Sequence, residues 1–80
     1  MVYFTDLKIT RVRPFSTGVH IRAVHPELED YEYDFIIHSD GRVVGQSHSG
    51  IWYDITPDNA RIIKRKLSAF LIGRNDIFPA

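Results

Sequence analysis

Histidine and carboxylate side chains could give this chain catalytic or metal-binding chemistry. The four histidines are His20, His25, His38 and His48. A zinc site gathers its ligands at short loop spacings or at i, i+4 on one helix face. No pair of histidines has either spacing, and a ligand set would need Glu27 or Glu29 as well. We therefore expect no metal and no cofactor, and we interpret the histidines as separate surface residues.

Serines next to two of the histidines bring the residue types of a hydrolase triad together. Ser39 and Asp40 follow His38, and two more serines flank His48. Neighbours along a strand point to opposite faces, which is the wrong geometry for a nucleophile and its base. The chain has no cysteine, so a thiolate nucleophile and thiolate zinc ligands are excluded. We expect a protein that is not an enzyme.

A cluster of carboxylates is the most unusual charge feature of the chain. Its members are Glu27, Glu29, Asp30, Glu32 and Asp34. Such a segment suits a basic partner surface, including the groove of a protein that normally holds nucleic acid. The alternative is a solubilising loop followed by an edge strand that its charges protect from aggregation. Both interpretations stay open at this point.

Basic residues lie on either side of that acidic segment, although the formal net charge of the chain is zero. The cations that could contact a nucleic acid are Arg11, Arg13, Arg22, Arg61, Lys64 and Arg65. Lys and Arg on such a surface neutralise phosphates and make binding depend on salt. The second half of the set has a simpler explanation, since cations on the solvent side of a helix and toward its end are stabilising in themselves.

The first half of the chain has the alternation of strands. We expect one strand over residues 2–12, ended by Pro14, and a second over 19–24 with Val19, Ile21 and Ala23 facing inward. Residues 25–30 form the predicted connection. Tyr31, Tyr33, Phe35 and Ile37 then share the core face of a third strand, while Glu32, Asp34 and His38 share the other.

Asp40 and Gly41 predict a two-residue type I′ turn after the third strand. That turn would pair Ile37 with Val44 and place Val44 beside the aromatic stripe. Residues 51–53 are three apolar residues in succession, which predicts burial from more than one side.

A helix is predicted to begin after Thr56, with Pro57 in its first position and Asp58 in its first turn. Its apolar stripe is Ala60, Ile63, Leu67, Phe70 and Leu71. Gly73 is well placed to end it. The stripe should cover the inward side chains of the strands, which are Leu7, Ile9, Val19, Ile21, Tyr33, Phe35 and Ile37. We thus expect one α+β domain over residues 1–80, with a single antiparallel sheet of three to five strands and one C-terminal helix in two layers.

Residues 19–71, with their hairpin, further strand and helix, resemble the small three-stranded DNA-binding domains at the N-terminus of tyrosine integrases. The resemblance is one of architecture and implies that the outer sheet face contacts DNA. Here Glu32 and Asp34 fall on that face and would repel phosphate.

We therefore favour a small non-catalytic binding protein, an inhibitor of the type that phages and mobile elements produce, whose acidic segment occupies a basic surface of another protein. The alternative is a DNA- or RNA-binding regulatory module. A homodimer through an exposed strand edge or through Ile77 and Phe78 stays open. With no apolar run long enough for a membrane span, we expect no membrane partner and a cytoplasmic location.

Overall fold

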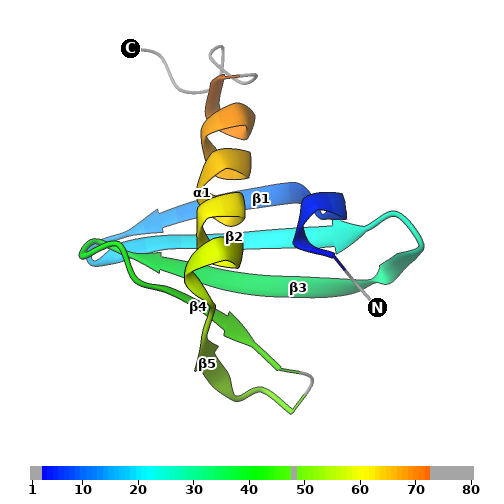
Figure 1. The fold of residues 1–80 in the computed structure, drawn as a ribbon, viewed down its shortest axis with the longest axis horizontal. Helices are drawn as coiled ribbons and strands as arrows, with labels where there is room; N and C mark the ends of the chain where they lie inside the picture. The colour runs from blue at the N-terminus through cyan, green and yellow to red at the C-terminus, as the bar shows by residue number, and fades with distance from the viewer. Residues whose placement is uncertain (1–2, 48, 73–80) are drawn as a thin grey trace.

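Short strands joined by tight turns lead into one helix along this chain. The computed structural model describes residues 3–47 and 49–72. A 3-10 helix, η1 (Phe4–Asp6), precedes the strands β1 (Lys8–Phe15), β2 (Gly18–His25), β3 (Leu28–His38), β4 (Val43–Gln46) and β5 (Trp52–Asp54), and α1 (Pro57–Ile72) follows them. The sheet has the order β1-β2-β3-β4-β5 and each neighbouring pair is antiparallel (Figure 1). The predicted two-layer α+β fold is confirmed, with five strands in its sheet.

The helix covers one face of the sheet, and the core lies between them. Its buried members are Leu7, Ile9, Ile21, Ala23, Phe35, Val43 and Ile63, with Ala60, Leu67 and Phe70 of α1 packed against them. The inward side chains of β2 and four members of the predicted stripe of α1 are thus confirmed, whereas Leu71 does not belong to the core cluster. The helix begins at Pro57, as expected, and the Ala60 amide donates to the Thr56 carbonyl over 2.8 Å.

Strand β1 differs from the prediction at both ends and in its middle. Phe4 to Asp6 are in η1, and the strand continues through Pro14, which pairs with Val19. Proline is tolerated there because β1 is an edge strand with no partner on its other side. A bulge between Ile9 and Arg11 inserts Thr10, so that Ile9 lies opposite Ala23 and Arg11 opposite Arg22. The bulge reverses the facing of every later residue of the strand.

The hairpin between β3 and β4 also differs from the prediction. The Gly41 amide donates to the His38 carbonyl and the His38 amide to the Arg42 carbonyl, each over 2.8 Å. Gly41 has a φ of 94°, while Asp40, like every other described non-glycine residue, has a negative φ. The loop is therefore a three-residue turn with a left-handed glycine, and the predicted type I′ turn is wrong.

This extra loop residue moves the register by one position. Val43 pairs with Ile37 and is buried in the core, while Val44 pairs with Ile36 on the opposite face. The predicted pairing of Ile37 with Val44 is wrong, because a shift of one residue exchanges the two faces of a strand.

Other expectations concern β5, the connection before β3 and the C-terminal tail. Ile51, Trp52 and Tyr53 are 66%, 41% and 48% exposed, so their predicted burial is wrong; β5 is a short edge strand. The predicted connection over residues 25–30 is only a turn at Pro26 and Glu27, because β3 already begins at Leu28. Gly73 and the tail with Ile77 and Phe78 lie outside the described residues, as does His48.

Candidate functional site

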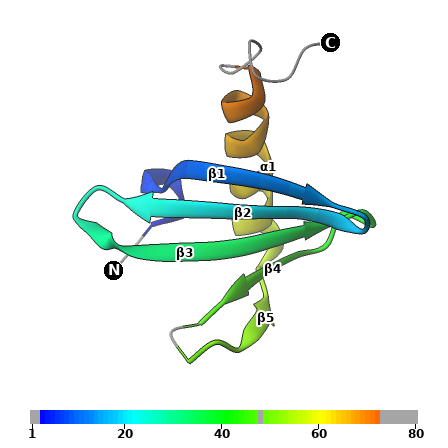
Figure 2. The same ribbon diagram turned by 180° about the vertical axis from the view of Figure 1, so that it is seen from behind.

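The face of the sheet opposite α1, the outer face, is not covered by any described element (Figure 2). Strand register assigns its side chains, and the bulge in β1 is included in this assignment. They include Lys8, Arg11, Arg13, Phe15, His20, Arg22, Val24, Glu32, Asp34, Ile36, His38, Val44, Gln46, Trp52 and Asp54. Charged and aromatic residues therefore share a surface whose reverse side is the core.

Three arginines of the outer face lie together on β1 and β2, and we name them the arginine cluster: Arg11, Arg13 and Arg22. With His20 they line one small pocket. Arg11 lies opposite Arg22 in the sheet and Arg13 opposite His20. Among the described residues, the side chains of Arg11 and Arg13 make no hydrogen bond or ion pair. Their guanidinium donors are therefore available to a ligand, and this availability depends on the bulge at Thr10.

The carboxylates of the outer face are bound to neighbouring basic groups. Arg22 Nε donates to Asp34 Oδ1 over 3.1 Å, and its Nη1 lies 3.6 Å from Glu32 Oε2. His20 Nε2 lies 3.0 Å from the same Asp34 oxygen. The hydrogen bond to Asp34, followed by the charges of Asp34 and Glu32, raises the pKa of Arg22 above its usual value. The predicted outward facing of Glu32 and Asp34 is confirmed, and both take part in this network.

The predicted acidic segment is divided between two places. Glu32 and Asp34 belong to the network on the outer face, whereas Glu27 lies in the β2–β3 turn and Asp30 near the start of β3. Glu27 and Asp30 are exposed and line a shallow groove with Pro26, Leu28 and Tyr31. The side chain of Glu29 lies outside the described part of the structure.

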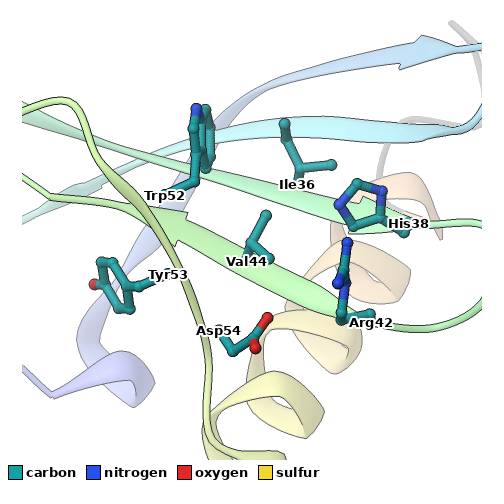
Figure 3. Close-up of a pocket in the computed structure, with 7 residues that line it drawn as sticks. All are labelled: Ile36, His38, Arg42, Val44, Trp52, Tyr53 and Asp54. Atoms are coloured by element: carbon teal, nitrogen blue, oxygen red, sulfur yellow. The ribbon is translucent and has the colours of Figure 1, made fainter.

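A second part of the outer face is hollowed, and we name it the Trp52 groove. Its volume is about 440 Å³ and its lining residues are Ile36, His38, Arg42, Val44, Trp52, Tyr53 and Asp54 (Figure 3). Ile36 and Val44 pair across β3 and β4 and form an apolar floor, in which Val44 is only 8% exposed. The Trp52 ring also meets the His20 ring edge to face, with centroids 6.5 Å apart, so the groove adjoins the arginine cluster.

Ile36 is the one residue of this groove that the sequence pattern alone marks as unusual. It is an apolar residue on the polar parity of its strand, and a solvent-facing strand seldom needs one. The rest of the groove depends on the hairpin register, because only the three-residue loop places Val44 beside Ile36. Trp52 belongs to the site through β5, where the sequence pattern predicts burial instead.

The helix cations belong to the other layer. Arg61, Lys64 and Arg65 are exposed on α1, and Arg61 Nη2 lies 3.8 Å from Asp58 Oδ1 of the same helix. Arg61 and Lys64 line a separate groove beside the β3–β4 hairpin. The structure thus gathers Arg11, Arg13 and Arg22 on one face and separates them from the helix cations.

The histidines are distributed over the molecule. His20 and His38 face outward as expected, but His25 ends β2 and is 7% exposed, so its predicted surface position is wrong. Its Nδ1 accepts the Glu27 amide over 3.1 Å, and its Nε2 lies 3.8 Å from Asp6 Oδ2. Over residues 3–47 and 49–72, no three histidine or carboxylate side chains gather as a metal site. In the same residues no helix is both long and apolar enough to cross a membrane.

Comparisons with known proteins give no relative: no protein-family model, no curated protein and no solved structure matches this chain.

Proposed function

We propose that this protein is a small non-catalytic binding module whose outer face binds nucleic acid. The observation that carries the proposal is the arginine cluster, where Arg11 and Arg13 present guanidinium groups that no described residue pairs, on a face that no described element covers. Guanidinium groups bind phosphate through two parallel hydrogen bonds. Interleaved aromatic and basic side chains on a sheet are also a common layout for binding single strands.

The carboxylates of β3 are compatible with this function. Asp34 accepts from Arg22 and lies against His20, and Glu32 lies within ion-pair distance of the same arginine. Their charge is therefore compensated locally, which weakens the repulsion of phosphate that the sequence alone suggested. His20 and Arg22 contact the same oxygen, Asp34 Oδ1. The His20–Asp34 contact therefore belongs to this network of the outer face.

The test is a titration of fluorescein-labelled oligonucleotides, single-stranded and duplex, followed by anisotropy at several salt concentrations. We expect the double variant Arg11→Ala/Arg13→Ala to lose at least about tenfold in affinity at low salt, and its salt slope to fall by about 1 for each phosphate that is no longer neutralised. Arg61→Ala/Arg65→Ala is the matched control, since it removes two exposed cations from α1. Equal losses in the two variants, or no binding by the wild type, would contradict the proposal.

The acidic groove at the β2–β3 turn supports a second candidate function, the capture of a basic protein. Glu27 and Asp30 are exposed beside Leu28, which is 48% exposed, so an apolar contact and two carboxylates lie together. This arrangement suits an inhibitor, of the phage or mobile-element type that the sequence suggested, that occupies a basic surface of another protein.

Nuclease-treated affinity capture separates the two functions. A basic partner that wild type and Arg11→Ala/Arg13→Ala both retain, but that Glu27→Lys/Asp30→Lys loses, would support the second candidate. Charge reversal at Glu29, Glu32 and Asp34 then tests whether the rest of the acidic segment takes part. Retention by all of these variants would exclude the acidic segment as the binding surface.

A further inference from the structure

The Trp52 groove combines three kinds of wall. Figure 3 shows the Trp52 ring standing at one side of Ile36 and Val44, with His38 and Arg42 on the opposite side. Asp54 lies at the margin, and no ion pair joins it to Arg42 in the described structure. The groove thus offers an aromatic surface, an apolar floor and polar groups along its edge.

We propose that the Trp52 groove holds one unstacked base of a single-stranded nucleic acid. This inference rests on the proposed function, because it names the form of nucleic acid that the outer face binds. A nucleobase is flat, apolar over its two faces and polar along its edge. The Trp52 ring and the floor match the faces, His38 and Asp54 match the polar edge, and Arg42 matches the attached phosphate.

The size and position of the groove agree with this ligand. Its volume of about 440 Å³ lies within the range of about 300–1,000 Å³ that small-molecule sites occupy. His20 connects the groove to the arginine cluster, since it lies opposite Ile36 on one side and Arg13 on the other. A strand whose base enters the groove would thus have its neighbouring phosphates beside Arg11 and Arg13.

The groove selects single strands because a paired base has no free face. In a duplex each base is covered above and below by its neighbours, so it cannot stack on Trp52 without leaving the helix. In a single strand the cost of unstacking is small, and each base stacked on an aromatic residue contributes about 1–3 kcal/mol. Trp52 is 41% exposed and already packs against His20, so its ring is positioned before a ligand arrives.

The chain provides a direct reporter for this proposal, because Trp52 is its single tryptophan. Titration with a single-stranded oligonucleotide should quench its fluorescence in parallel with the anisotropy change of a labelled probe. Trp52→Ala should weaken single-strand binding about 5-fold to 150-fold, which is the fold-change equivalent of one stacked base. Trp52→Phe should retain most of the affinity, since it keeps an aromatic face.

The matched control is Tyr3→Ala, which removes an aromatic side chain that is 60% exposed just before η1 and does not line the Trp52 groove. Its affinity should equal that of the wild type. Circular dichroism establishes that each variant is folded, and the quenching of Trp52 fluorescence in the wild type keeps the test decisive if Trp52→Ala does not fold. DNA and RNA strands of the same sequence are titrated in parallel. The strand that binds with the higher affinity shows whether the bound base belongs to DNA or to RNA.

The outcomes distinguish this inference from the proposed function. Single-strand binding that Trp52→Ala weakens and Tyr3→Ala leaves unchanged supports the inference. Binding that Arg11→Ala/Arg13→Ala weakens but Trp52→Ala does not, or binding that is tighter for duplex, overturns the inference and leaves the function standing. No binding of any oligonucleotide at low salt overturns both.

Discussion

The two faces of the sheet are built from the same alternating strands but differ in the contacts that their side chains make. The inner face is closed by α1 and by apolar contacts, with Ile21, Ala23 and Ile63 fully buried. The outer face has no cover among the described elements, and its side chains bind one another through the network of His20, Arg22 and Asp34. The inner face therefore holds the fold together, while the outer face is available for binding.

The largest effect should come from breaking the inner face. Ile63→Ala empties a site that is 0% exposed at the centre of the core, and should lower the free energy of unfolding by about 2–5 kcal/mol. Ile72→Ala is the matched control, because it makes the same change on the same helix at a residue that is 71% exposed. It should change the free energy of unfolding by less than about 0.5 kcal/mol. Urea unfolding measures both. Equal effects would show that α1 does not close the core.

A smaller loss is expected from crowding the inner face. A Cβ added at Gly45 would lie 2.9 Å from Ile55 Cδ1 and 3.2 Å from Phe35 Cδ1. The Ile55 methyl group ends a flexible side chain and can shift, so Gly45→Ala should cost about 1 kcal/mol, at the low end of overpacking losses. The urea midpoint of the variant checks this, and Ile55→Val in the same chain should restore part of the loss because it removes the contacting methyl group. A neutral Gly45→Ala would mean that β4 does not lie this close to Phe35.

The outer face should respond in binding more than in stability. Asp34→Asn removes the charge that holds Arg22 and His20, so the arginine cluster gains a free cation and loses a repulsive carboxylate. Affinity for nucleic acid at low salt should rise several-fold, and the rise should shrink as salt is added. Asp58→Asn, the same substitution on α1, should leave the anisotropy titration unchanged. A fall in affinity for Asp34→Asn would mean that the network positions the ligand.

The smallest effect is expected at the β3–β4 loop, which sets the register of these two strands. Asp40 Oδ1 accepts the Arg42 amide over 2.9 Å, and this hydrogen bond lowers the pKa of Asp40 below its ordinary value of 3.8. Because the folded-state pKa is lower, the contribution to stability is present above pH 3.8 and is lost as the pH falls through the lower folded value. Asp40→Ala should reduce the acid dependence of urea unfolding slightly. An unchanged dependence would contradict this role.

The sequence predicted the inner face well, because burial imposes a strict pattern. The stripe of α1 and the alternation of Val19, Ile21 and Ala23 were sufficient to place the helix against the strands. The outer face depended on two irregularities that alternation cannot reveal. The bulge at Thr10 turns Arg11 and Arg13 outward, and the left-handed Gly41 exchanges Val43 and Val44 between faces.

These irregularities were hard to predict for a physical reason. A bulge adds one residue to a strand without changing the amino-acid composition. Asp-Gly suits both a two-residue and a three-residue turn, so the packing of Val43 in the core decides which turn forms. The ion pairs of Glu32 and Asp34 could not be seen either, because Arg22 reaches them only across the pairing of β2 with β3.

An amide chemical-shift titration with a short single-stranded oligonucleotide tests the central claim most directly, because it reports on both layers at once. We predict that the largest shifts lie at Arg11, Arg13, Arg22 and Trp52 on the outer face. Shifts concentrated on α1 around Arg61 and Arg65, or at the β2–β3 turn, with the outer face unchanged, would contradict this claim.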